Sequence, residues 1–123
     1  MKNQILGSKG EQEAAAFLQQ QGYDICARNF RAPIGEIDII AAQGEWLLFV
    51  EVKTRKPNAL VSGLAAVDAR KQQHIIHAAE QYLLRHPADL QPRFDVAEVE
   101  YSGSFVRHIE YIPFAFDASG YEW

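Results

Sequence analysis

Four charged residues stand inside two apolar stretches of the segment Gly35–Arg55, G-E-I-D-I-I-A-A-Q-G-E-W-L-L-F-V-E-V-K-T-R. They are Glu36, Asp38, Glu51 and Lys53. Both stretches are rich in β-branched and aromatic residues, which is typical of strands. A charge buried in a strand is costly unless it is paired with an opposite charge or binds a metal ion. We therefore expect these side chains to meet in the folded protein.

The turn between the two stretches predicts how the charges are arranged. If Gly44 and Glu45 are the central turn residues, continued antiparallel pairing sets Asp38 opposite Glu51. Opposed side chains lie on one face of a sheet, with Cβ atoms about 5 Å apart. Lys53, two residues beyond Glu51, shares that face because side chains alternate along a strand. A shift of one residue in the turn would break the direct opposition, so the arrangement depends on this register.

Two opposed carboxylates repel each other, and a divalent cation removes that repulsion. Mg²⁺ takes oxygen ligands and keeps several waters, so it suits such a pair, with Glu36 on the same face. A metal there can activate water and neutralise the charge that develops in phosphoryl transfer, while a lysine positions the nucleophile. The chemistry indicated is metal-dependent hydrolysis of phosphodiesters. The alternative is a structural cluster of ion pairs at the end of a sheet, and the spacing alone does not exclude it.

Hydrophobic periodicity predicts the elements that hold these residues. Residues 8–21 predict a helix, in which Ser8 caps the N-terminus and Glu11, three residues later, completes a capping box. A second helix is expected from about residue 68 to residue 85. The predicted strands are 23–31, 37–42, 46–53, 94–101 and 105–112. The order α-β-β-β-α-β-β predicts an α/β fold with a mixed β-sheet flanked by helices, because the second helix can join parallel neighbours.

Composition bounds the class of protein. The 123 residues fit one domain, 1–123, with a core from about 7 to 112 and a tail, 113–123, that the sequence does not place. Cys26 is the single cysteine, which excludes an internal disulfide and suits a reducing cytosol. The N-terminus lacks the apolar core of a signal peptide, and no apolar run approaches the roughly 20 residues that cross a bilayer. We expect a cytoplasmic protein without a membrane partner.

The net charge of −4 argues against a simple binder of polyanions, but it is unevenly distributed. From Asp95 onward there are six acidic residues and one basic residue, a balance of −5, so residues 1–94 carry +1. Basic residues gather around the central hairpin and the second helix. A local basic surface is therefore compatible with an acidic protein, and scattered solubilising charges are the alternative.

An ordered set of segments resembles the uncharacterised bacterial YraN family. The segments are G-S-K-G-E-Q-E-A-A-A-F-L, N-F-R, G-E-I-D-I-I, F-V-E-V-K-T-R, the helix with K-Q-Q-H, and R-F-D-V, and they cover roughly residues 7–100. That family is itself similar to archaeal Holliday-junction resolvases. Asp38 followed by Glu51-Val52-Lys53 looks like the signature of the PD-(D/E)XK nuclease superfamily, although the bare pattern also occurs by chance. The resemblance implies a restriction-endonuclease-like fold and favours a functional role for the charged patch.

The resemblance also implies a role for each matching residue. Asp38 and Glu51 would ligate Mg²⁺ or Mn²⁺, with the backbone carbonyl of Val52 as a further ligand. Lys53 would position or activate the attacking water. Glu11 matches an additional acidic residue of the resolvase-like members, although its capping role accounts for it equally well. Glu36 would lie close to the metal ligands or to the substrate.

Weaker candidates lie around this patch. Four basic residues are candidates for phosphate contacts, and for each the alternative is a solvated surface charge: Arg31, Arg55, Lys56 and Lys71. Gln72 and Gln73 match a position where some nucleases place a glutamine near the metal, and helix surface is the alternative. His74 and His77 are spaced i, i+3, but without a third ligand they do not predict a zinc site. Arg93 and Asp95 are expected to form a structural pair, and Cys26 to lie in the core.

Three functions follow from these features. The first is a Mg²⁺- or Mn²⁺-dependent endonuclease acting on structured or branched DNA, and cutting a junction would imply a homodimer. The second is a nucleic-acid-binding module that keeps the nuclease fold without cutting. The third is a protein-interaction domain, suggested by the acidic C-terminal part. The loop 54–63 is long enough to contact a substrate.

Overall fold

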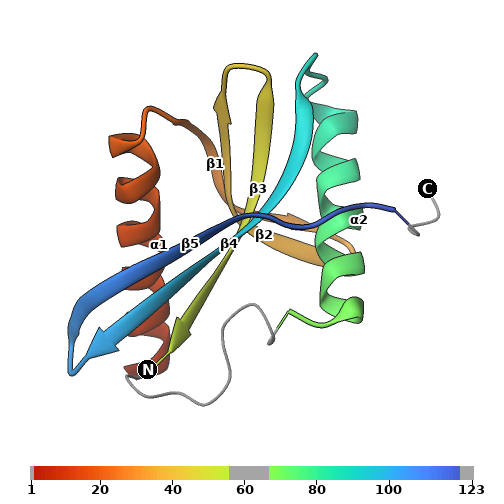
Figure 1. Ribbon diagram of the computed structural model, residues 1–123. Coiled ribbons are helices and arrows are strands. Elements are labelled where there is room, and N and C mark those ends of the chain that lie inside the picture. Colours follow the sequence, from red (N-terminus) through yellow and green to blue (C-terminus); the bar gives the residue numbers. More distant parts are fainter. Residues whose placement is uncertain (1, 56–66, 120–123) are drawn as a thin grey trace.

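Two helices lie on opposite sides of a five-stranded sheet in the computed structural model, which describes residues 2–55 and 67–119 (Figure 1). The elements are α1 (Lys2–Gln20), β1 (Asp24–Ala32), β2 (Gly35–Gln43), β3 (Trp46–Arg55), α2 (Ala69–Arg85), β4 (Gln91–Ser102) and β5 (Phe105–Phe116). The predicted order and the α/β class are confirmed. The predicted substrate loop, 54–63, lies outside the described residues except for its first two, which belong to β3.

The strands lie in the order β1-β2-β3-β4-β5. Pairing is antiparallel except between β3 and β4, which are parallel and are joined through α2. At the β2–β3 turn Gln43 pairs with Trp46, as predicted, and Gly44 has the positive φ of 58° that a two-residue turn with glycine first requires. The central strands are buried on both faces, which explains their continuous apolar runs.

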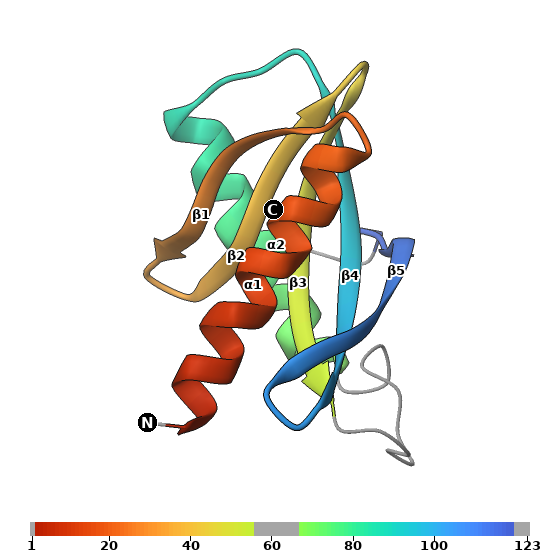
Figure 2. The same ribbon diagram turned by 90° about the vertical axis from the view of Figure 1, so that its left-hand side faces the viewer.

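Each helix covers one apolar face of the sheet, so there are two cores. Under α1, the buried Ala14 and Leu18 pack on side chains of β2, β3 and β4. Under α2, Ile75, Ile76 and Tyr82 pack on the other face, around Phe49. Figure 2 shows α1 in front of the sheet and α2 behind it. No helix among the residues that the structure describes is long and apolar enough to span a bilayer.

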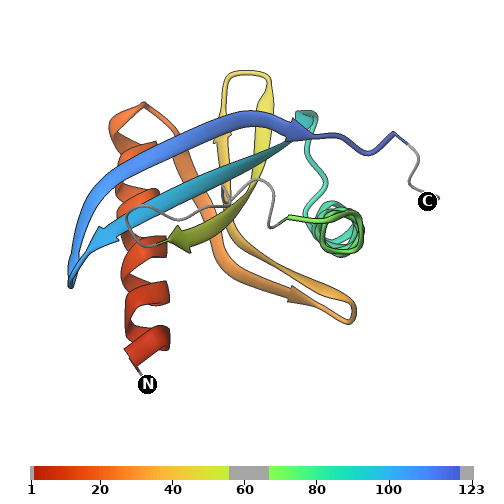
Figure 3. The same cartoon turned by 60° about the horizontal axis from the view of Figure 1, so that its bottom comes forward.

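The sheet divides at Asp38. Ile37 packs in the core under α2, whereas Ile39 packs in the core under α1, although strict alternation would put both on one face. The adjacent strand is irregular at the same level, because Asn29 has a left-handed φ of 53°. The pairing of β2 with β3 ends at Ile39–Val50. Beyond that pair the strands diverge, β2 toward α2 and β3 toward α1 (Figures 1 and 3).

The predicted start of the first helix was wrong because the helix begins earlier in the chain. Helix α1 begins at Lys2, so Ser8 lies inside the helix and cannot be its N-cap. Glu11 therefore loses the capping role that accounted for it. At the other end the helix stops where predicted, at Gly22, whose N–H donates to the Gln19 carbonyl at 3.0 Å.

The two C-terminal strands, predicted at 94–101 and 105–112, are longer than expected, and each extension contains a proline. Pro92 lies near the start of β4, where β5 no longer pairs, so its missing N–H leaves no hydrogen bond unmade. Pro113 lies within β5, an edge strand, at an irregularity between the pairs Val96–Ile112 and Phe94–Phe116. Strand β5 therefore runs on to Phe116.

Cys26, expected in the core, is exposed. The register of β1 against β2 shifts between Ile25 and Ala27, so Cys26 is the extra residue of a bulge on an edge strand. Its side chain is consequently free of the core.

Candidate active site

Glu51 and Lys53 lie on the face of β3 that is turned toward α2. Phe49, two residues earlier on β3, packs in the core under α2, and alternation continues that face through both residues. The side chain of Glu51 is only 6% exposed, and Lys53 Nζ lies 3.5 Å from Glu51 Oε1. The predicted contact between these two residues is therefore present.

Asp38 reaches the same place from β2, although not by the predicted pairing. The last residue pair between β2 and β3 is Ile39–Val50, so Asp38 and Glu51, which come next, do not pair. Instead, the N–H of Val52 donates to Asp38 Oδ2 at 2.8 Å. The carboxylate thus takes the place of a backbone acceptor where the two strands part. Asp38 and Glu51 are neighbours across the split rather than a cross-strand pair.

Lys71 joins the cluster from the first turn of α2. Asp68 caps this helix, because its Oδ1 accepts from the Lys71 N–H at 2.8 Å. The docked helix brings Lys71 Nζ to 3.5 Å from Glu51 Oε1, the same oxygen that Lys53 approaches. Two ammonium groups from different elements therefore face one buried carboxylate oxygen.

Glu11 approaches Asp38 from α1. Its side chain hydrogen-bonds those of Asn29 and Asp38, and Arg28 lies 3.8 Å away. Burial, and then the Asp38 charge, raise the pKa of Glu11. A hydrogen bond between two carboxyl groups requires that one of the two carries a proton. This places Glu11 beside a predicted metal ligand, as the resemblance implied.

Two carboxyl groups of the site have raised pKa values. Burial raises the pKa of Asp38, and the Val52 N–H opposes that rise. Burial, and then the Asp38 charge, raise the pKa of Glu51 to about 7. Carboxylates with pKa values raised in this way are typical of functional sites, since a fold gains no stability from them.

The donor set suits a hard divalent cation. No group of three or more His, Cys, Asp or Glu side chains with metal-binding geometry occurs within residues 2–55 and 67–119. Mg²⁺, however, commonly binds through one or two carboxylates, several waters and substrate phosphates. A buried and a half-buried carboxylate that lower each other's tendency to ionise fit that pattern, and Val52, which follows Glu51, donates its N–H to Asp38. Its carbonyl remains a predicted ligand.

The remaining candidates lie apart from this cluster or are already paired. Arg31 is exposed and lies 4.0 Å from Glu36, its cross-strand partner. Arg55 is ion-paired to Glu98 at 2.7 Å and to Glu100 at 3.5 Å. Lys56 lies outside the described residues. Arg31 and Arg55, the two of these positions that the structure describes, therefore both have acidic partners.

Two glutamines and two histidines of α2 were weaker candidates. Gln72 donates its side-chain amide to the Val67 carbonyl at 3.0 Å, and Gln73 is exposed. His74 and His77 have no third metal ligand among the residues that the structure describes. The glutamine and zinc alternatives therefore gain no support.

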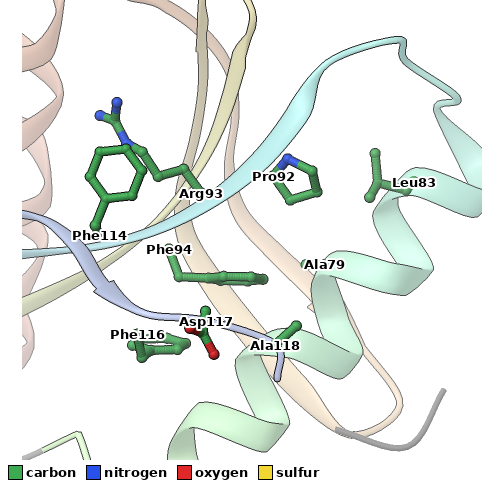
Figure 4. A pocket seen from close by; sticks show the side chains of 9 residues that line it. All are labelled: Ala79, Leu83, Pro92, Arg93, Phe94, Phe114, Phe116, Asp117 and Ala118. Carbon is green, nitrogen blue, oxygen red and sulfur yellow. The ribbon is translucent and has the colours of Figure 1, made fainter. Parts of the chain in front are cut away.

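A separate hollow of about 270 Å³ lies near the start of β4, where the rings of Phe94 and Phe116 stack 5.2 Å apart (Figure 4). Arg93 lines it, but its guanidinium is held by Asp95 at 2.9 Å, as the expected pair. The Asp95 carboxylate, fully buried, also accepts from the Phe114 N–H at 3.0 Å. The hollow is mainly apolar and its charges are satisfied, so the carboxylate cluster is the better candidate site.

The positions of two residues of the site could not be predicted from the sequence. Lys71 was a candidate for a phosphate contact, but its position beside Glu51 depends on how α2 docks. Asn29 was not singled out, although it holds Glu11 and marks the irregularity that turns Asp38 aside. Asparagine tolerates a left-handed φ, and this was the one available signal.

Comparison with known proteins gives a family without a described activity. Residues 10–99 match the model of "Uncharacterised protein family UPF0102". A UPF0102 protein of Syntrophotalea carbinolica is 45% identical over 117 residues, covering 94% of each chain. One from Geobacter metallireducens is 42% identical over 118 residues, covering 95% of this chain and 96% of its own. A third, from Nitrosomonas europaea, is 41% identical over 113 residues, with 92% and 94% covered.

Proposed function

The chain belongs to the uncharacterised protein family UPF0102, and from the geometry of its carboxylate cluster we propose that it is a metal-dependent endonuclease of structured DNA. The observation that carries the proposal is the meeting of the buried carboxyl group of Glu51 with the half-buried one of Asp38, beside Lys53. Burial and mutual repulsion raise the pKa of Glu51 to about 7, which is a cost that a bound cation would remove.

Each residue has a separate task in this proposal. Asp38 and Glu51 hold Mg²⁺ or Mn²⁺, with the Val52 carbonyl as a further ligand. When bound, the metal supplies a Lewis acid that lowers the pKa of water and neutralises charge on a phosphate oxygen. Lys53, 3.5 Å from Glu51, positions the attacking water, and Glu11 holds a proton beside Asp38. The resemblance to resolvase-like nucleases supports DNA as the substrate and the cytoplasm as the location.

The test is cleavage of labelled junction, flap and duplex DNA by the purified protein, with and without Mn²⁺. We expect Mn²⁺-dependent cleavage that falls by at least about a hundredfold in Glu51→Gln and Asp38→Asn, because each removes a ligand charge. Glu110→Gln is the matched control, since Glu110 is an exposed carboxylate on β5 that pairs with His108. Cleavage that survives in both site variants would refute the site.

The same experiment also tests the other two candidate functions. Binding of DNA without cleavage, unchanged in Asp38→Asn, would favour a nucleic-acid-binding module. Absence of binding even at low salt, where phosphate contacts are strongest, would favour a protein-interaction domain. Resolution of a junction requires two coordinated cuts, so that substrate also requires a homodimer, which sedimentation of the protein with junction DNA would reveal.

A further inference from the structure

Lys71 presents its ammonium group to Glu51, one of the two carboxylates that the proposed function assigns to the metal. Its Nζ lies 3.5 Å from Glu51 Oε1. Burial raises the pKa of both Asp38 and Glu51, and the Lys71 ammonium opposes the rise in both. One positive charge from α2 therefore acts on both of the carboxylates that would hold the metal.

Lys71 differs from Lys53 in how firmly it is held. Lys53 lies on the same strand as Glu51, two residues away, and its side chain is 28% exposed. Lys71 reaches over from another element, and its side chain is 40% exposed. Both ammonium groups lie 3.5 Å from Glu51 Oε1, beyond the ordinary length of an N–H···O bond, about 2.7–3.2 Å, so the two lysines differ in exposure and in the element that carries them. A flexible lysine stem in this position can leave the carboxylate without disturbing the helix.

We propose that Lys71 is a displaceable counter-ion, which pairs with Glu51 until a divalent cation enters and then turns to a phosphate of the bound nucleic acid. The inference rests on the proposed function, since it takes Asp38 and Glu51 as the metal ligands. A divalent cation at Glu51 would repel both nearby ammonium groups, and Lys71, whose side chain is the more exposed and comes from another element, is the one that can move away. The nearest acceptor of the right charge is then a substrate phosphate.

The first test is binding of Mn²⁺ by calorimetry at about pH 8, where Glu51 is ionised. Lys71→Met keeps the length of the side chain and removes its charge, and we expect it to bind Mn²⁺ roughly tenfold more tightly than the unchanged protein. Arg70→Met is the matched control, because Arg70 is the preceding, exposed residue of the same helical turn. We expect it to change the affinity by less than about twofold.

The outcomes separate this inference from the proposed function. If the unchanged protein binds Mn²⁺ and Lys71→Met binds it equally or more weakly, the counter-ion role is wrong and the metal site stands. If neither binds Mn²⁺, both proposals fail. If only Lys71→Met binds, the competition is directly demonstrated.

The second test determines whether the Lys71 ammonium group contacts a DNA phosphate when a divalent cation is bound. Affinity for a labelled duplex is measured over a range of salt concentrations, with and without Ca²⁺. A phosphate contact contributes about 0.9 to the slope of log affinity against log salt. We expect Lys71→Met to lose this amount when Ca²⁺ is present and nothing when it is absent. A loss under both conditions would indicate a permanent phosphate contact and would overturn the displacement.

Discussion

Glu51 is a buried carboxyl group whose surroundings indicate a functional role. It is 5% exposed, it lies beside a second carboxylate, and its pKa is raised to about 7. The charges of two lysines lower the pKa of Glu51, but it remains far above the ordinary value of 4.5. A structural ion-pair cluster would be expected to lower the pKa of its acid. This difference argues against the purely structural alternative.

The raised pKa makes the stability of the protein depend on pH. An acid with a higher pKa in the folded protein binds more protons when folded, so its favourable contribution is full below about pH 4.5 and is lost as the pH rises through about 7. Glu51→Gln removes this loss. We expect the variant to match the unchanged protein near pH 4.5 and to exceed its free energy of unfolding by roughly 2–3 kcal/mol near pH 8. Urea denaturation at the two pH values measures this.

An equal effect of Glu51→Gln at both pH values would contradict the raised pKa. The stabilised variant also serves the cleavage experiment, because its loss of activity cannot be ascribed to unfolding.

The residues of the site were predictable from the sequence to the extent that local rules govern them. Strand alternation put Lys53 beside Glu51, and the turn set the register that brings Asp38 to their level. Two steps depend on tertiary structure: the irregularity at Asp38, and the docking of α2 that brings Lys71 to Glu51. No local rule connects Lys71 with a strand almost twenty residues earlier, so its position had to come from the structure.

At the scale of elements, the β1–β2 hairpin is fitted closely against α2. Gly35 has a φ of 123°, and a Cβ atom there would lie 2.2 Å from the backbone oxygen of His74. Such a contact with backbone cannot be relieved by a side-chain rotation. The hairpin and the helix therefore approach each other only because residue 35 is glycine.

Gly35→Ala tests this packing. We expect a loss of about 3 kcal/mol or more in the free energy of unfolding, because strain of φ adds to the clash with α2. Gly44→Ala is the control, since Gly44 also has a positive φ, 58°, but nothing lies within 4 Å of its Cβ position. It should cost only about 1 kcal/mol. Thermal or urea denaturation measures both, and similar losses would show that φ, not the helix contact, sets the requirement.

The order of elements followed from the sequence, whereas several ends did not. The last strand was expected to end at residue 112, yet it runs through Pro113 to Phe116, because an edge strand has no partner on one side and tolerates proline. Ser8 was expected to start a helix that begins at Lys2. Both predictions took one residue as a boundary, whereas the neighbouring residues allow the strand or the helix to extend beyond it.

At the scale of the molecule, the carboxylate cluster lies where the pairing of β2 and β3 ends, and beyond that point the two strands diverge (Figure 3). The basic residues around it carry acidic partners among the described residues: Arg28 has Glu11, Arg31 has Glu36, Arg55 has Glu98, and Lys71 has Glu51. The local basic surface that composition allowed is therefore largely neutralised. The net charge of −4 adds a repulsion toward any polyanion.

Binding of DNA should accordingly depend on the divalent cation. A cation held by Asp38 and Glu51 adds two positive charges at the division of the sheet, where phosphate would otherwise meet carboxylates. We expect Ca²⁺ to raise the affinity for a labelled duplex by roughly tenfold at low salt, and this gain to disappear in Asp38→Asn. Glu110→Gln, which removes an exposed negative charge from β5, should keep the gain. Equal affinity with and without Ca²⁺ would mean that nucleic acid binds elsewhere on the protein, because the paired lysines and arginines of this region have little free charge to offer it.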